Sequence, residues 1–197
     1  MNKILTLIIC AALAGCIGCA DGRDKSVKHQ ARGEMYHKTG DYKRALANLN
    51  KAIDLDGKNT EAYASRGALL YAMGDYKAAL ADFGVVAARQ PNRPDVYSAA
   101  GAALAAMGDL MPARENLLRS LQLNPSNAAA YASLGGIYFE TGNYKASIAE
   151  YSKAIALQPS GSLHYMRGAA WQHYGKPEQA AADFKAAGLE EKDYPKL

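Results

Sequence analysis

The sequence predicts an all-α protein built from repeated helix hairpins, and three observations support this fold class. Alanine, the best helix former, occurs 39 times in 197 residues, whereas there are only 4 valines and 7 prolines. Apolar residues recur with the 3.6-residue period of a helix along most of the chain. Glycines recur at an almost constant interval. The net charge of +4 is too small for a dedicated nucleic-acid binder, so we expect no nucleic-acid partner.

Residues 1–15 are predicted to be a secretory signal and not part of the fold. Lys3 supplies a positive start, and residues 4–14 are uncharged but too few to span a bilayer as a helix. The segment ends in Leu13-Ala14-Gly15-Cys16, which resembles the lipobox of bacterial lipoproteins at all four positions. The resemblance implies cleavage before Cys16 and lipid attachment to its sulfur. An ordinary signal peptide cut near Ala20 is the alternative.

Residues 16–25 are expected to form a lipidated cysteine followed by a short polar tether. Several acyl chains give a stable membrane anchor where a single chain would not. Ile17 follows Cys16 at the position where an Asp retains enteric-type lipoproteins at the inner membrane. The resemblance therefore implies a bacterial envelope protein anchored in the outer membrane and facing the periplasm. Cys19 is interpreted as a spare thiol.

Two glycine series divide the rest of the chain into five units. Both series advance in steps of 34, 34, 34 and 33: Gly33, Gly67, Gly101, Gly135, Gly168, and Gly40, Gly74, Gly108, Gly142, Gly175. Each unit reads as an apolar helical segment, a turn at the second glycine, and another helical segment. The predicted units are 26–59, 60–93, 94–127, 128–160 and 161–194, with a tail at 195–197.

The signature residues of these units resemble those of the tetratricopeptide repeat (TPR). The fourth unit shows them best: Tyr131, Leu134, Gly135, Tyr138, Gly142, Tyr144, Tyr151, Ala154 and Pro159. The resemblance implies a right-handed superhelical solenoid of five helix hairpins. It also implies that the first helices line a concave groove for protein partners.

The resemblance indicates which residues line this groove. They are Ala64, Ser65, Ala68, Tyr71, Ser98, Ala99, Ala102, Ala132, Ser133, Gly136, Phe139, Tyr165 and Met166. Most are small and none is charged, which favours an apolar or amphipathic segment of a partner protein. Alternatively, the alanines only permit tight winding, and the partner binds the convex face or the C-terminal end.

Two arginines are predicted to form structural ion pairs. Arg66 and Arg167 precede a first-helix glycine, and Asp82 and Asp183 follow them by sixteen residues. These positions face each other in a helix hairpin, so each arginine is matched within its own unit. Arg32 and Asn48 have the same spacing. The alternative is a row of arginines that binds an acidic ligand.

No pattern typical of a catalytic or metal site stands out. The four histidines are scattered, and there is no phosphate-binding glycine loop and no nucleophile elbow. We therefore expect no enzymatic activity, no metal, no cofactor and no small-molecule substrate.

These features predict a membrane-anchored scaffold or adaptor lipoprotein that serves envelope complex assembly and is similar in build to NlpI-type adaptors. A pilotin-like role in pilus or secretion-system assembly is the alternative, and a wall-polymer-binding or wall-active protein is a weaker one. The first predicted unit carries seven basic and four acidic residues. The basic excess either forms a solvated face or is attracted to anionic lipid headgroups. At the other end, Leu189, Tyr194 and Leu197 either cap the last helices or leave them open to a partner.

Overall fold

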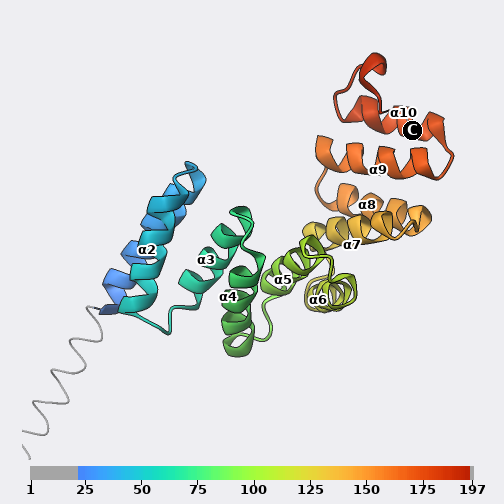
Figure 1. The fold of residues 1–197 in the computed structure, drawn as a ribbon. Helices are drawn as coiled ribbons and strands as arrows, with labels where there is room; N and C mark the ends of the chain where they lie inside the picture. The colour runs from blue at the N-terminus through green and yellow to red at the C-terminus, as the bar shows by residue number, and fades with distance from the viewer. Residues whose placement is uncertain (1–21, 196–197) are drawn as a thin grey trace, which may run out of the picture. The chain divides into compact units, whose positions relative to one another are not determined.

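A computed structural model describes residues 22–195, and all regular secondary structure within this range is helical (Figure 1). The all-α prediction is therefore confirmed for the described residues. The chain divides into two compact units, one ending at Arg89 and the other beginning at Gln90. Each unit consists of helix hairpins and is described by itself.

The first unit contains two hairpins. Its helices are residues 22–38, α2 (Tyr42–Leu55), α3 (Thr60–Ala72) and α4 (Tyr76–Arg89). Leu69 of α3 is fully buried and packs with Ala45 and Leu49 of α2. The two hairpins are therefore joined by a shared apolar core.

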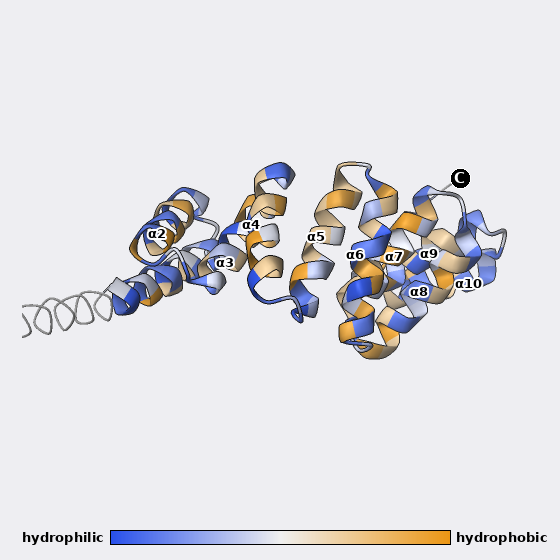
Figure 2. Cartoon of the chain, turned by 90° about the horizontal axis from the view of Figure 1, so that it is seen from below, coloured by the Kyte–Doolittle hydropathy of each residue, from blue (hydrophilic) through white to orange (hydrophobic). Residues whose placement is uncertain are grey.

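The second unit contains three hairpins and a short terminal turn. Its helices are α5 (Pro94–Ala106), α6 (Leu110–Leu123), α7 (Ala128–Glu140), α8 (Tyr144–Leu157), α9 (Gly161–His173), α10 (Pro177–Ala186) and the 3-10 helix η1 (Glu191–Asp193). Ala130, Leu134 and Ile137 of α7 pack with Ala113 and Leu117 of α6. As in the first unit, the core forms between successive hairpins. Figure 2 colours α5 mainly in orange and tan, which reflects its alanine-rich sequence.

A glycine with positive φ closes the turn within each hairpin. At Gly40, Gly74, Gly108, Gly142 and Gly175, φ lies between 73° and 84°, a conformation that side chains other than glycine adopt only with strain. The residue after the glycine directly precedes the next helix. Asn143, for example, accepts a hydrogen bond from the backbone N–H of Ala146 and caps α8.

The first glycine of each of the five repeats allows the two helices of a hairpin to approach closely. A Cβ atom added to Gly67 would lie 2.6 Å from the ring of Phe83 on α4. The bulky residue of the second helix thus occupies the space that the glycine leaves, which explains why both residue types recur at a fixed spacing.

The predicted tether needs a correction at its end. Residues 22–25 are helical and continue into the first hairpin. Ser26, directly after them, is fully buried and its hydroxyl donates to the carbonyl of Ala52. This contact with α2 holds the start of the helix on the hairpin, so the polar composition of this segment does not make it a linker.

Candidate protein-binding surface

The first helices of the hairpins carry the residues that the sequence predicts to bind a partner. In the second unit α7 contacts both α5 and α9, so the three first helices lie side by side. Eight of the predicted residues recur on these helices at helical spacing, so those on one helix lie on the same side of it, and all eight are partly or well exposed. We call them the first-helix face: Ala99, Ala102, Ala132, Ser133, Gly136, Phe139, Tyr165 and Met166.

Two large side chains on α9 are the most open part of the first-helix face. Tyr165 and Met166 are 42% and 44% exposed, although both are large and mainly apolar. The ring of Tyr165 lies 5.7 Å from that of Phe184, so its inner edge rests on the hairpin core. These two residues can therefore offer apolar contact area to another molecule without leaving their positions.

The remainder of the first-helix face is small and uncharged. Gly136 lies above Tyr151, since a Cβ added to this glycine would be 3.6 Å from the tyrosine hydroxyl. Tyr151 is only 4% exposed, and burial, with a contribution from the nearby charge of Glu140, raises its pKa to about 12. The hydroxyl therefore stays neutral at physiological pH.

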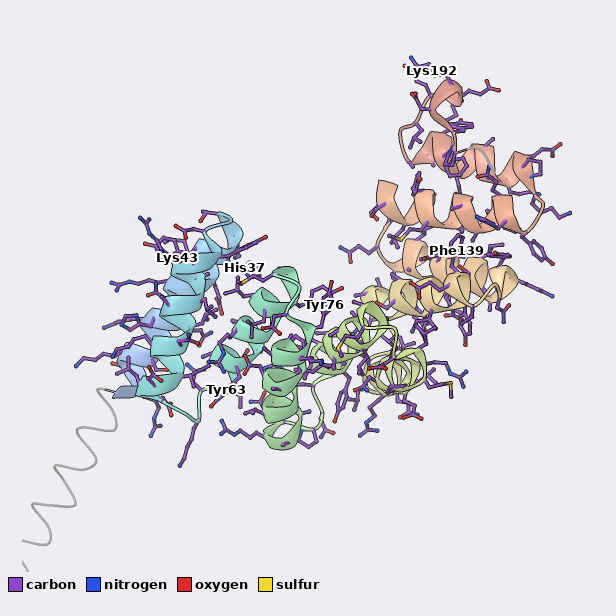
Figure 3. All side chains as sticks on the ribbon, in the orientation of Figure 1. His37, Lys43, Tyr63, Tyr76, Phe139 and Lys192 are labelled. Carbon is purple, nitrogen blue, oxygen red and sulfur yellow. The ribbon has the colours of Figure 1, made fainter. Side chains whose placement is uncertain are left out.

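Phe139 forms the edge of the first-helix face at one hairpin turn (Figure 3). Its ring makes edge-on contacts with Tyr144 at 5.5 Å and with His173 at 5.2 Å between centroids. His173 in turn stacks on Tyr144 at 5.0 Å. No sequence pattern predicts this three-ring cluster, which joins the hairpin of α7 and α8 to α9.

Ser98 differs from the other predicted groove residues of the second unit. Its side chain is only 9% exposed, and its hydroxyl donates to the backbone carbonyl of Asp95 within the same helix turn. Helical spacing alone did not distinguish it from Ala99, the half-buried next residue. Ser98 therefore offers almost no surface to a partner.

The other predicted groove residues lie on α3 in the first unit. Ala64 is half-buried and Ala68 is exposed, while Tyr71 is 38% exposed and contacts the ring of Tyr76. The Ser65 hydroxyl donates to Glu34 at 2.7 Å, which ties α3 to the preceding helix.

The structure brings Arg66 and Asp82 together. The guanidinium donates through Nε and Nη2 to the two carboxylate oxygens at 2.8 and 2.7 Å, and Asp82 is only 4% exposed. Donation to Asp82 raises the pKa of Arg66 despite partial burial. The same guanidinium also donates through Nη1 to Asn50 of the preceding hairpin.

Arg167 and Asp183 form the same arrangement in the last hairpin. Arg167 donates to both carboxylate oxygens at 2.7 Å, and it also donates to Ser152 of the preceding hairpin. His164 Nδ1 lies 3.0 Å from Asp183. Burial acts to raise the pKa of this carboxyl, but donation from Arg167 and His164 outweighs it and lowers the pKa.

Both arginines therefore link two successive hairpins as well as the two helices of their own hairpin. Asn50 and Ser152 were not predicted from the sequence, where their only signal is a position sixteen or fifteen residues before the arginine. The spacing also suggested that Arg32 pairs with Asn48. Instead, Oδ1 of Asn48 accepts a hydrogen bond from Nδ1 of His29, and its amide nitrogen donates to the carbonyl of Arg44 in α2. An amide cannot offer a guanidinium two anionic oxygens.

The C-terminal residues of the described range fold back on the last hairpin. The ring of Tyr194 lies 5.3 Å from that of Phe184 in a tilted arrangement, and the carbonyl of Pro195 accepts a hydrogen bond from Gln172. These residues border an open pocket of about 180 Å³ beside α10. Tyr194 thus covers part of the end of the stack, whereas Leu197 lies outside the described residues.

Cys16, the predicted lipid-attachment site, also lies outside the described residues, as do the other two cysteines. Across residues 22–195, no helix combines the length and apolar character that crossing a membrane requires. Over the same residues, no three His, Cys, Asp or Glu side chains gather as a metal site would require.

Comparison with known proteins identifies the repeat type. A TPR repeat family model matches residues 33–74, and a tetratricopeptide repeat model matches residues 98–162. Together the two matches cover more than half of the chain. No curated protein sequence matches it significantly.

Solved structures of similar fold include MamA and a Thermus protein. The crystal structure of MamA protein is 22% identical, with a TM-score of 0.67 over 88% of this chain and 98% of that one. TTC0263, a thermophilic TPR protein in Thermus thermophilus, is 21% identical, with a TM-score of 0.74 over 85% and 93% of the two chains. At these identities the likeness shows the fold alone.

Proposed function

Because this chain is a tetratricopeptide repeat protein, which makes it a scaffold for protein–protein interaction, we propose that it binds a partner segment on its first-helix face. The observation that carries the proposal is the exposure of Tyr165 and Met166 next to a row of small residues. Large apolar side chains on such a surface supply contact area, and a tyrosine does so at little entropic cost.

The composition of the first-helix face defines the chemistry of the partner. None of its eight residues is charged, so the partner gains little from charged anchors there. Alanine and glycine keep the surface of α5 and α7 shallow, which lets a partner backbone or helix approach closely. An amphipathic helix or an extended apolar segment fits this surface best.

We further propose that the protein is anchored in the bacterial envelope through lipid on Cys16. The support is the run Leu13-Ala14-Gly15-Cys16 and its resemblance to a lipobox. On this proposal the scaffold serves the assembly of envelope complexes, at the periplasmic side of the outer membrane. A pilotin-like role in pilus or secretion-system assembly is a second candidate with the same anchor and the same binding surface.

Arginine substitutions test the first-helix face. Ala102→Arg and Ala132→Arg place a long cation on the face, while the helix-pair core is untouched. Ala149→Arg on the exposed side of α8 is the matched control. We expect at least tenfold weaker capture of crosslinked envelope partners by the two face variants, unchanged capture by the control, and unchanged thermal melting of all three. Wild-type capture by both face variants would exclude this surface as the main binding site.

The lipid anchor needs a separate test. Cys16→Ser is expected to abolish incorporation of a fatty-acid analogue and to leave the protein soluble or unprocessed, whereas Cys19→Ser keeps the label. Labelling that depends on Cys19 and not on Cys16 would overturn the assignment.

A further inference from the structure

The first helix of the chain's first hairpin carries an exposed basic stripe. Lys28, Arg32, Met35 and Lys38 follow each other at spacings of four, three and three residues, so they share one side of the helix. All four are exposed, and Met35 is 51% exposed. We call these four residues the amino-terminal stripe.

The register of the repeat shows what this side of the helix does elsewhere in the chain. Leu69, the equivalent of Met35 one unit later, is fully buried against α2 of the preceding hairpin. The fourth repeat shows the same packing. Its residues Ala130 and Ile137 are the equivalents of Lys28 and Met35, and they pack against α6 of the preceding hairpin. Lys28 and Met35 therefore lie on the side of the helix that packs against a preceding hairpin later in the chain. Within residues 22–195 no hairpin precedes this first helix.

No acidic side chain of the same hairpin, within the described residues, forms an ion pair with the amino-terminal stripe. Glu34 accepts hydrogen bonds from Gln30 and Ser65, and Asp41 caps α2 and pairs with Arg44. By contrast, Lys28, Arg32 and Lys38 form no hydrogen bond or ion pair with another residue of the described range. Figure 3 shows long side chains projecting from this hairpin on the side away from α3.

A cap that only kept the end of the stack soluble would need neither an excess of one charge nor an exposed methionine. Three cations that pair with no other residue between 22 and 195, grouped around one apolar side chain, match the interface of an anionic bilayer. Basic side chains are attracted to such a surface, and an apolar side chain can enter the boundary between headgroups and acyl chains.

We propose that the amino-terminal stripe docks on an anionic phospholipid bilayer, with its cations among the headgroups and Met35 at their inner boundary. The inference deepens the proposed function and rests on it in one respect, because the lipid anchor would hold the stripe near a membrane. Lys28 follows Cys16 by twelve residues, which span at most about 40 Å. Docking would thereby fix the orientation of the first hairpin on the membrane.

Vesicle binding by the full chain carrying Cys16→Ser tests the stripe without lipid attachment. The protein is sedimented with vesicles of phosphatidylcholine alone or of phosphatidylcholine mixed with phosphatidylglycerol, at low salt. We expect tighter binding to the anionic vesicles. Each exposed basic residue near such a surface contributes about fivefold in affinity, so Lys28→Gln with Arg32→Gln should reduce the preference by about 25-fold.

Lys145→Gln with Lys185→Gln is the matched control. It removes two exposed lysines from α8 and α10 and therefore the same net charge. We expect the control to change the preference by less than about twofold. An equal loss in both double variants would overturn the proposal, because net charge alone would then explain binding. Equal affinity of the parent chain for both kinds of vesicle would overturn it as well.

Met35→Ser gives an independent check on the apolar part of the stripe. It should weaken binding to anionic vesicles several-fold without altering the dependence of binding on salt. No effect of Met35→Ser would remove the methionine from the proposed contact and overturn that part of the proposal. Fatty-acid labelling at Cys16 is measured separately, so failure of the anchor and failure of the stripe give different results.

Discussion

Arg66 and Arg167 show how a single side chain can join three helices. The planar guanidinium offers two parallel N–H groups to one carboxylate and still has an N–H left for a neighbour. In both hairpins the carboxylate lies on the second helix of the same unit, and the remaining bond reaches the preceding hairpin. The buried charge is therefore compensated, which argues for a structural role for these arginines.

Removing one partner of this arrangement should destabilise the protein. In Asp183→Ala, Arg167 and His164 lose their shared carboxylate, and a guanidinium remains half-buried without its anion. We expect the free energy of unfolding to fall by about 3 kcal/mol in chemical denaturation. Asn116→Ala is the control, since Asn116 occupies the same register in a unit without the arginine; its effect should stay below about 1 kcal/mol.

Partner capture separates the structural from the functional interpretation of these arginines. If Arg167 serves stability alone, Asp183→Ala binds its partner normally at temperatures where it is folded. Retained stability combined with lost capture would contradict this interpretation and assign the arginine to binding.

Tyr151 provides a pH-dependent test of burial. Its pKa is about 12 in the folded chain and about 10 in an unfolded one, so between these values only the unfolded state loses the proton. The free energy of unfolding should therefore fall as pH rises from 10 to 12, by at most about 3 kcal/mol from this residue. Tyr151→Phe should remove this part of the slope in denaturation at about pH 9, 10 and 11. An identical slope in the variant would show that the hydroxyl is not shielded.

At the scale of the helices, glycines determine where a large side chain of the facing helix can pack. The first glycine of each unit faces the large residue sixteen positions later, and the second glycine adopts the positive φ of the turn. Both constraints act within one hairpin and recur at a fixed spacing. For this reason the sequence was sufficient to predict the helix hairpins.

Contacts between hairpins were harder to predict because they depend on how one helix pair is placed on the next. The bond from Arg66 to Asn50 and the stacking of His173 on Tyr144 cross such a boundary. Ser98 is a related case, since its burial depends on the position of α5 against its neighbours. Periodicity gives the side of a helix that a residue occupies, but the neighbouring hairpin decides how much of that side is covered.

Two glycines of the second hairpin allow a matched test of helix packing. Gly67→Ala places a methyl group 2.6 Å from the ring of Phe83, so α3 and α4 must separate. We expect it to lower the free energy of unfolding by about 1 to 3 kcal/mol, although alanine favours a helix more than glycine does.

Gly84→Ala on α4 is the control for this change. No atom lies within 4 Å of the added methyl group, so only the helix propensity changes. We expect the variant to be more stable than the wild type by about 0.5 to 1 kcal/mol in the same denaturation experiment. Destabilisation by both substitutions would contradict the packing described for this hairpin.

Within each compact unit, at the scale of the whole molecule, interactions are mainly between successive helices and hairpins. In the second unit α6 contacts α7 and α8 contacts α9, whereas α5 and α6 have no substantial contact with α9 or α10 among the described residues. The free energy of unfolding of such an array is close to the sum of the intrinsic stabilities of its hairpins and the contributions of the interfaces between neighbouring hairpins. Such a chain can lose order in one hairpin while a distant one stays folded.

Native-state hydrogen exchange of the second unit tests this linear organisation. Asp183→Ala removes interactions of α9 and α10 only, so these two helices should exchange faster. A loss of about 3 kcal/mol in local opening corresponds to about 150-fold faster exchange. Amides of α5 and α6 should keep their wild-type rates, and those of α7 and α8 should change by an intermediate factor. A uniform increase from α5 to α10 would instead show that the three hairpins open as a single cooperative unit.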